Sequence, residues 1–166
     1  NFASSISPWI VTMDALEPFR VKGPEQSPEP LPYLQQKGAK AFDINLEVAI
    51  QPENEVETVV SRSNFKYMYW SMAQQLAHHT INGCRVNSGD MMGSGTISGP
   101  TEDSFGSMLE LSWGGQKPLK MNGGSERKFI NDNDTVIIRG YCQKDNLRIG
   151  FGEVSSKLLP AVELKF

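Results

Sequence analysis

Residues 42–50 read FDINLEVAI, and large apolar side chains recur at every second position of this stretch. Successive side chains of a β-strand point to opposite faces, so this period of two predicts a half-buried strand over 42–50. The face expected to pack on the core carries Phe42, Ile44, Leu46, Val48 and Ile50, and the opposite face carries Asp43, Asn45, Glu47 and Ala49.

Short apolar or alternating segments continue through the second half of the chain, separated by turn-forming text such as Asn122-Gly123-Gly124. Many short strands at this spacing are typical of a sandwich, a roll or a barrel. The sequence therefore predicts a mainly β fold, a mixed β-sandwich roll or β-barrel-like domain. Its further strands are expected near residues 91–97, 106–113, 116–121, 127–130, 134–143 and 147–153.

One packed helix is predicted within this β fold, over about residues 63–82. Apolar side chains recur there at spacings of three and four, which is the period of an amphipathic helix. Ser61 and Ser63 are candidates for its N-terminal cap, and Asn82-Gly83 is expected to end it. The recurring side chains are Phe65, Met68, Tyr69, Met72 and Leu76.

Residues 17–38 contain five prolines among charged residues. Proline has a fixed φ and no N–H donor, which disfavours helix and central sheet, so this stretch is expected to be an ordered surface loop. A length of 166 residues suits one domain of ordinary size. Residues 1–166 are therefore predicted to form a single domain.

Composition narrows the possible partners and location. The net charge is −3, from 16 basic and 19 acidic residues, which disfavours nucleic acid and anionic membrane surfaces as partners. No apolar run approaches the roughly 20 residues of a membrane span. Cys84 and Cys142 lie far apart, in neither a CxxC nor a Cys/His spacing, so two reduced thiols are expected rather than a zinc site or a disulfide. We therefore expect a cytoplasmic location.

Common catalytic motifs are not found in this sequence. His78 and His79 are adjacent near the end of the predicted helix, where they point about 100° apart and cannot both face one metal. Capping or packing is favoured for both over catalysis. No serine stands in a G-x-S-x-G elbow, and the glycines at 93, 95 and 99 lack the spacing of a nucleotide-binding loop.

Glu110 and Thr96 are the two candidates for chemistry. Glu110 alternates with Leu109 and Leu111 in the expected strand 106–113, where burial would raise its pKa and make it a possible partner for an imidazole base. Thr96 lies in a glycine-rich bend, where its hydroxyl and amide suit a substrate carboxylate or carbonyl. From composition alone, a solvated strand face for Glu110 and a simple hairpin or bulge for Thr96 are favoured.

The chain resembles the fumarylacetoacetase family over nearly its full length. The most specific segments are RSNFKYMYW at 62–70 and SFGSMLELSW at 104–113, together with SGTISGP at 94–100. The looser pattern of the wider superfamily, a Gly-Asp turn leading to a Gly-Thr bend, is present at 89–90 and 95–96. The resemblance implies the fold of the C-terminal portion of that family's catalytic domain.

The family hydrolyses the carbon–carbon bond of 4-fumarylacetoacetate to fumarate and acetoacetate at the end of tyrosine breakdown, and it acts as a homodimer. The resemblance implies that Mg²⁺ or Ca²⁺ binds the diketone oxygens while an imidazole held by a carboxylate activates water. By position, Glu110 resembles that catalytic carboxylate, and Thr96 resembles a substrate-binding contact. This reverses the preference from composition at both sites.

The family's metal-binding carboxylates, catalytic histidine and carbanion-stabilising side chains fall before the text that matches Asn1. The chain is therefore expected to be the C-terminal part of a larger catalytic domain, with no metal ligands of its own and no activity alone. His78 and His79 match a different histidine pair of the family. Two alternatives stay open: another oxo-acid hydrolase or decarboxylase of the superfamily, and a non-catalytic ligand-binding β-domain.

Overall fold

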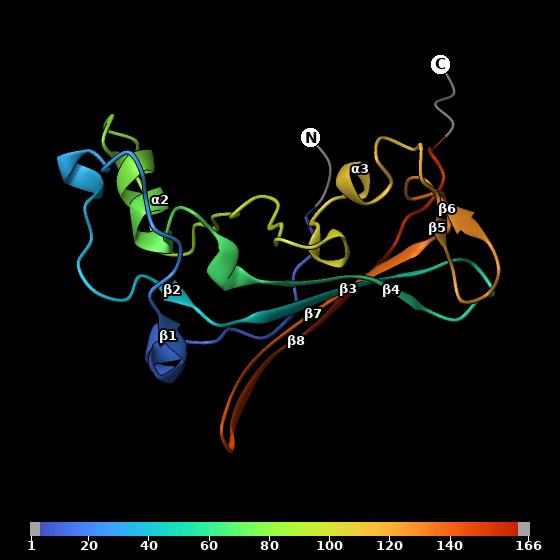
Figure 1. The fold of residues 1–166 in the computed structure, drawn as a ribbon. Helices are drawn as coiled ribbons and strands as arrows, with labels where there is room; N and C mark the ends of the chain where they lie inside the picture. The colour runs from blue at the N-terminus through green and yellow to red at the C-terminus, as the bar shows by residue number, and fades with distance from the viewer. Residues whose placement is uncertain (1–3, 163–166) are drawn as a thin grey trace.

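The computed structural model describes residues 4–162, and its largest element is a four-stranded antiparallel sheet. The strand order is β4-β3-β7-β8, so strands far apart in the sequence lie side by side. The β7–β8 hairpin extends well beyond the other two strands (Figure 1). The strands are β3 (Asn45–Gln51), β4 (Thr58–Asn64), β7 (Thr135–Lys144) and β8 (Leu147–Lys157).

Two small two-stranded sheets lie at opposite ends of the main sheet (Figure 1). One pairs β1 (Arg20–Val21) with β2 (Ala41–Phe42), and the other pairs β5 (Leu119–Lys120) with β6 (Glu126–Arg127). All three sheets are open and antiparallel within the described residues. The prediction of a mainly β fold is confirmed.

The helical elements are short. They are α1 (Met13–Leu16), η1 (Glu17–Phe19), η2 (Pro32–Leu34), η3 (Phe65–Tyr67), α2 (Met72–Thr80), η4 (Glu102–Ser104) and α3 (Met108–Leu111), where η denotes a 3₁₀ helix. The predicted loop over 17–38 is largely irregular, although it contains η1, β1 and η2. Within residues 4–162, no helix has both the length and the apolar character needed to cross a membrane.

The alternation over 42–50 is confirmed in its first half. Phe42 and Ile44 are 3% and 6% exposed and pack in the core with Leu16, Phe19 and Cys142. The prediction is wrong at Ala49, which was expected on the open face and is fully buried. Its partner on β7, Ile137, is buried too, at 5% exposed.

The single helix predicted over 63–82 is wrong. Residues 63–64 belong to β4, a turn of 3₁₀ helix follows, and α2 begins only at Met72. Met68 has ψ 123°, an extended value that interrupts any continuous helix. Ser71 is the N-cap: its hydroxyl accepts from the Gln74 N–H, and the Gln74 side chain accepts from the Ser71 N–H.

The later strand predictions have mixed outcomes. Strands near 134–143 and 147–153 are confirmed as β7 and β8, whereas those near 116–121 and 127–130 shrink to the two-residue strands β5 and β6. The strand predicted over 91–97 is wrong because that segment is irregular. The strand predicted over 106–113 is also wrong, because its centre forms α3.

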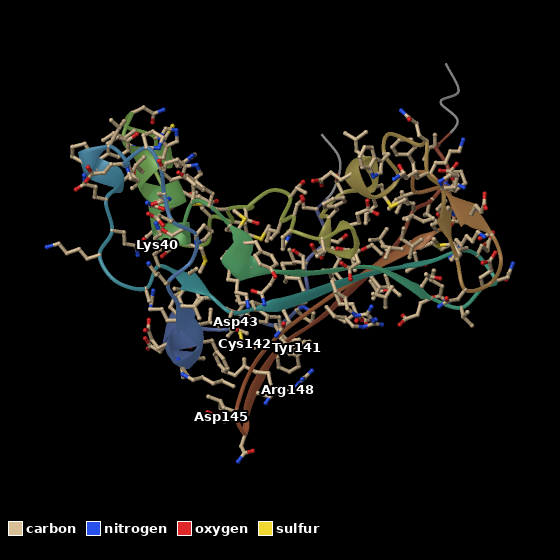
Figure 2. The ribbon with its side chains drawn as sticks, in the orientation of Figure 1. Lys40, Asp43, Tyr141, Cys142, Asp145 and Arg148 are labelled. Carbon is tan, nitrogen blue, oxygen red and sulfur yellow. The ribbon has the colours of Figure 1, made fainter. Side chains whose placement is uncertain are left out.

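Both cysteines are free thiols, as predicted, with Cys84 exposed and Cys142 buried. Burial, together with the nearby Asp43 carboxylate, raises the pKa of Cys142 to about 11. Figure 2 labels Asp43 and Cys142 close together beside the root of the β7–β8 hairpin. The buried thiol therefore stays protonated and unreactive at neutral pH.

Candidate active site

Three segments enclose a cleft of about 550 Å³. They are the residues around η3, the loop that contains Thr96, and α3. The cleft brings together Thr96 and Glu110, the two site residues singled out from the sequence. The lining side chains are Tyr67, Met68, Tyr69, Trp70, Thr96, Ile97, Ser98, Ser107, Leu109 and Glu110.

Glu110 reaches this cleft from the single turn of α3. Ser107 caps that turn, because its hydroxyl accepts from the Glu110 N–H at 3.3 Å and its carbonyl accepts from the Leu111 N–H at 3.0 Å. A carboxylate in the first turn of a helix is also favoured by the partial positive charge of the free N–H groups. The local sequence Ser-x-x-Glu therefore forms a capped turn that presents Glu110, rather than the strand that we predicted.

Two serine hydroxyls surround the Glu110 carboxylate. Ser107 donates to Oε2 at 2.7 Å, and Ser98 lies 2.8 Å from Oε1 and 2.9 Å from Oε2. The bonds from Ser107 and then Ser98 lower the pKa of Glu110, because they outweigh the opposing effect of burial. The sequence-based expectation of a raised pKa is therefore wrong, and Glu110 is ionised at neutral pH.

Two hydrogen bonds with backbone N–H donors hold the loop that contains Thr96 against the segment before α3. The Gly106 N–H donates to Ser98 Oγ at 3.1 Å, and the Gly99 N–H donates to the Ser104 carbonyl at 2.8 Å. Gly95, with φ 76°, supplies the left-handed bend expected just before Thr96. These contacts place the exposed Thr96 at the cleft with Glu110.

Aromatic side chains form a wall of the same cleft. Tyr67, Tyr69 and Trp70 are 39%, 37% and 40% exposed. Tyr69 and Trp70 meet edge to face with ring centroids 5.1 Å apart, and the Tyr69 hydroxyl donates to the Ser27 carbonyl at 3.2 Å. Partly exposed aromatic faces of this kind suit a flat, unsaturated ligand.

Sequence reasoning missed the aromatic wall and both serines. The residues of YMYW at 67–70 were assigned to a helix, although three aromatic side chains within four positions are unusual for an exposed helical surface. Ser107 carried a detectable signal, because Ser-x-x-Glu is the pattern of a helix N-terminus. Nothing in the sequence around Ser98 indicated its contact with Glu110.

The histidines lie away from this cleft. His78, on α2, places Nδ1 3.0 Å from the Tyr33 hydroxyl and stacks on the Tyr33 ring. Neither His78 nor His79 is among the residues that line the cleft. The packing interpretation of His78 is therefore confirmed.

The residues of the cleft do not form a metal site by themselves. Over residues 4–162, no group of three or more His, Cys, Asp or Glu side chains is placed to hold a metal ion. Glu110 is the single carboxylate in the lining, and two hydroxyls already donate to it. Mg²⁺ and Ca²⁺ prefer several oxygen ligands, including carboxylates, so this donor set does not fit either ion.

The amino-acid sequence matches one protein family and several of its named members. Residues 1–158 match the family model described as fumarylacetoacetate (FAA) hydrolase C-terminal. The chain is 56% identical to a protein named fumarylacetoacetase from Dictyostelium discoideum, over 97% of this chain and 38% of the relative. It is 54% identical to the fumarylacetoacetase of Homo sapiens, over 98% of this chain and 39% of the relative, and 49% identical to that of Arabidopsis thaliana, over 97% and 38%.

The matched region thus spans less than two fifths of the length of these relatives, with 38% and 39% of their chains covered. The family match extends from the first residue past the end of β8 and includes every segment that lines the cleft. The chain therefore belongs to the fumarylacetoacetate hydrolase family and corresponds to its C-terminal region.

Proposed function

We propose that the whole protein is a fumarylacetoacetase, which hydrolyses the carbon–carbon bond of 4-fumarylacetoacetate to fumarate and acetoacetate at the end of tyrosine catabolism. The relatives at 49–56% identity are fumarylacetoacetases by name, which supports this assignment. The observation that carries it is the cleft itself, where an ionised Glu110 lies together with Thr96 beside an aromatic wall.

Glu110 has the properties of a carboxylate that holds a catalytic imidazole. Its pKa is lowered by the serine bonds, so it presents a negative charge to the cleft at neutral pH. We assign the imidazole to a part of the protein outside this chain. A negative carboxylate bonded to the ring N–H fixes the tautomer and stabilises the cation that forms when the other ring nitrogen takes a proton from water.

In the proposed reaction, one water molecule is consumed for each carbon–carbon bond that is cleaved. The water oxygen bonds to one carbonyl carbon of the substrate as its proton passes to the imidazole. The carbon–carbon bond breaks, one product carries the new carboxylate, and the carbanion of the other takes up a proton. Within this chain, the part of Glu110 is to hold and orient the base.

Thr96 is assigned to the binding of a substrate carboxylate. It is exposed at the cleft, and it offers one hydroxyl and one backbone N–H to a negative group. Tyr67 and Trp70 lie in the same cleft, where they suit the flat, conjugated fumaryl portion of the substrate. The substrate would thus lie along the aromatic wall, with one charged end at Thr96.

A divalent cation, Mg²⁺ or Ca²⁺, is assigned to carboxylates outside residues 4–162, because the donors of the cleft do not fit it.

We further propose that the protein is a cytoplasmic homodimer. Large apolar side chains near the start of the described region support an interface, with Ile6 65%, Trp9 70% and Ile10 92% exposed. Light scattering on the purified full-length protein would measure its mass directly.

The function is tested by comparing substrates. The purified full-length protein should consume 4-fumarylacetoacetate, followed by the loss of its absorbance, with a higher kcat/KM than for acylpyruvates. Product analysis should find fumarate and acetoacetate in equal amounts. Preferential turnover of an acylpyruvate would assign the protein to a related oxo-acid hydrolase, and no turnover of any diketo acid would support a non-catalytic ligand-binding domain.

A further inference from the structure

We propose that Ser98 and Ser107 are positioning residues whose hydroxyls hold the Glu110 carboxylate ionised and in one orientation, with Oε1 available to a donor in the cleft. The inference rests on the proposed function, in which Glu110 orients the base. It adds that the orientation of Glu110 is itself fixed by two side chains from separate segments, the loop after Thr96 and the cap of α3.

The proton of each serine hydroxyl is available to the Glu110 carboxylate, because the other contact of each hydroxyl is with a donor. The Ser98 oxygen accepts from the Gly106 N–H at 3.1 Å, and the Ser107 oxygen accepts from the Glu110 N–H at 3.3 Å. A hydroxyl has a single proton, and a backbone N–H cannot accept it. Both protons are therefore free to point at the Glu110 carboxylate.

These contacts favour the ionised carboxylate. The Ser107 proton lies on Oε2 and the Ser98 proton is shared between the two oxygens, at oxygen–oxygen distances of 2.7 to 2.9 Å. A proton on Glu110 would turn one of these acceptor oxygens into a donor and remove at least one contact. The lowered pKa of Glu110 agrees with this geometry.

The contacts are also unequal between the two oxygens. Among the hydrogen bonds from side chains, Oε2 receives one from each serine, whereas Oε1 receives the shared bond from Ser98. A carboxylate oxygen accepts about two hydrogen bonds, so Oε1 keeps more accepting capacity. Glu110 lines the cleft, so we assign Oε1 as the oxygen that accepts from the imidazole N–H.

The two serines differ in what else they do. Ser107 caps α3 as well as contacting the carboxylate, so its removal would disturb the helix turn itself. Ser98 lies in the loop and contacts Glu110 without capping α3. Ser98→Ala is therefore the cleaner variant, Ser98→Thr restores a hydroxyl, and Ser94→Ala is a matched control in the same loop, where the hydroxyl donates only to the neighbouring carbonyl at 3.1 Å.

The first measurement is the pH dependence of kcat and kcat/KM of the full-length protein acting on 4-fumarylacetoacetate. Removing a donor from Glu110 raises its pKa toward the ordinary value, so the acidic limb of the Ser98→Ala profile should move to higher pH. We expect kcat to fall severalfold in Ser98→Ala, Ser98→Thr to recover kcat and the position of the acidic limb, and Ser94→Ala to match the wild type. A profile that overlays the wild type, or a lower kcat without a shifted limb, would overturn the inference.

A second measurement separates this inference from the proposed function. Titration of ¹³C-labelled glutamate carboxyls by NMR in the full-length protein, with Glu110 assigned by its loss in Glu110→Gln, should show a higher pKa in Ser98→Ala. If the Glu110 pKa rises in Ser98→Ala but the wild-type protein does not hydrolyse fumarylacetoacetate, the positioning role is supported and the proposed function is wrong. An active protein whose Glu110 titration is unchanged by Ser98→Ala would remove the positioning role alone.

Discussion

Gly106 lies just before α3 and packs directly against the loop that contains Thr96. A Cβ at this position would stand 2.6 Å from the Ile97 carbonyl oxygen and 2.7 Å from the Thr96 side chain. The closest neighbour is backbone, which cannot move aside without shifting the loop. The absence of a side chain at Gly106 therefore allows the Thr96 loop to pack against the segment before α3.

We predict that Gly106→Ala lowers kcat/KM for fumarylacetoacetate by about tenfold or more, because small displacements of a binding group are costly. The protein should also lose about 1–3 kcal/mol of stability through overpacking. Steady-state kinetics and urea denaturation measure the two effects. Gly93→Ala is the control, since a Cβ there meets nothing within 4 Å, and equal kinetics for the two variants would contradict the account.

Asp134 is a second residue whose environment determines a measurable property. Its carboxylate accepts two bonds of 2.8 Å from the Arg127 guanidinium and one of 2.9 Å from the Asn131 N–H, and it is fully buried. Burial alone would raise the pKa of Asp134, but the bonds from Arg127 and Asn131 lower it below its ordinary value. The ion pair thus joins β6 to the turn before β7.

We predict that Asp134→Asn costs about 3 kcal/mol of unfolding free energy, because the Arg127 side chain, only 13% exposed, is left without a countercharge. The pKa of Asp134 is lowered on folding, so its contribution is complete above its unfolded pKa of about 3.9 and is lost as pH falls through the folded value. Urea titrations from neutral to acid pH should show this loss in the wild type and not in the variant. Parallel pH curves would contradict it, and the exposed Glu53→Gln is the control.

At the scale of elements, the start of α2 is determined by its N-cap, whereas the spacing of apolar residues predicted a start that is too early. Ser71 both caps α2 and donates to Gln36 in the proline-rich loop at 2.6 Å. Ser63, a predicted cap, lies in β4 instead, and its buried hydroxyl has no hydrogen-bond partner within residues 4–162. The two serines therefore make a matched pair for mutation.

We predict that Ser71→Ala destabilises the protein by about 1 kcal/mol or more through loss of the cap. Ser63→Ala should be neutral or slightly stabilising, since it removes a buried hydroxyl that makes no bond. Thermal or urea denaturation of both variants measures the difference. A larger loss for Ser63→Ala than for Ser71→Ala would favour the longer helix predicted from the sequence.

The long elements were predictable, and the short ones were not. The strands β7 and β8 alternate over many residues and were found within a few positions of their observed ends. In contrast, α3 spans four residues, too few to distinguish a period of two from one of 3.6. For the same reason, the sequence pattern predicted one helix that contains both Phe65 and Met72, although Phe65 belongs to η3 and Met72 to α2.

The candidate site was predictable only through resemblance. Composition favoured ordinary structural roles for Glu110 and Thr96, and the matching segments named both residues before the structure placed them in one cleft. The pKa of Glu110 was predicted in the wrong direction, because it depends on hydrogen bonds from Ser107 and from Ser98, which lies twelve residues away in the sequence. Contacts across loops of this kind leave no periodic signal.

At the scale of the whole molecule, this chain supplies only part of the proposed site. It contributes one ionised carboxylate, a threonine and an aromatic wall to the cleft, and the cleft does not fit a divalent ion. The relatives are more than twice as long, since the match covers only 38–39% of their length. The remaining groups of the proposed mechanism are assigned to the rest of the protein.

We predict that residues 1–166 alone neither hydrolyse fumarylacetoacetate nor bind Mg²⁺ or Ca²⁺ stoichiometrically, because the cleft offers one carboxylate. Isothermal titration with each ion, next to the full-length protein as the positive control, measures binding. Turnover under the same conditions measures activity. A stoichiometric metal site or catalysis in the isolated chain would show that these residues hold the complete site.

The central claim is that Glu110 orients the catalytic base of a fumarylacetoacetase. The most direct test is kcat of the full-length Glu110→Gln variant on 4-fumarylacetoacetate, with Glu102→Gln on the neighbouring η4 as control and circular dichroism to confirm folding. We expect Glu110→Gln to lower kcat by about 100-fold or more, since a neutral amide cannot stabilise the imidazolium. A folded Glu110→Gln variant with the kcat of the wild type would contradict the claim.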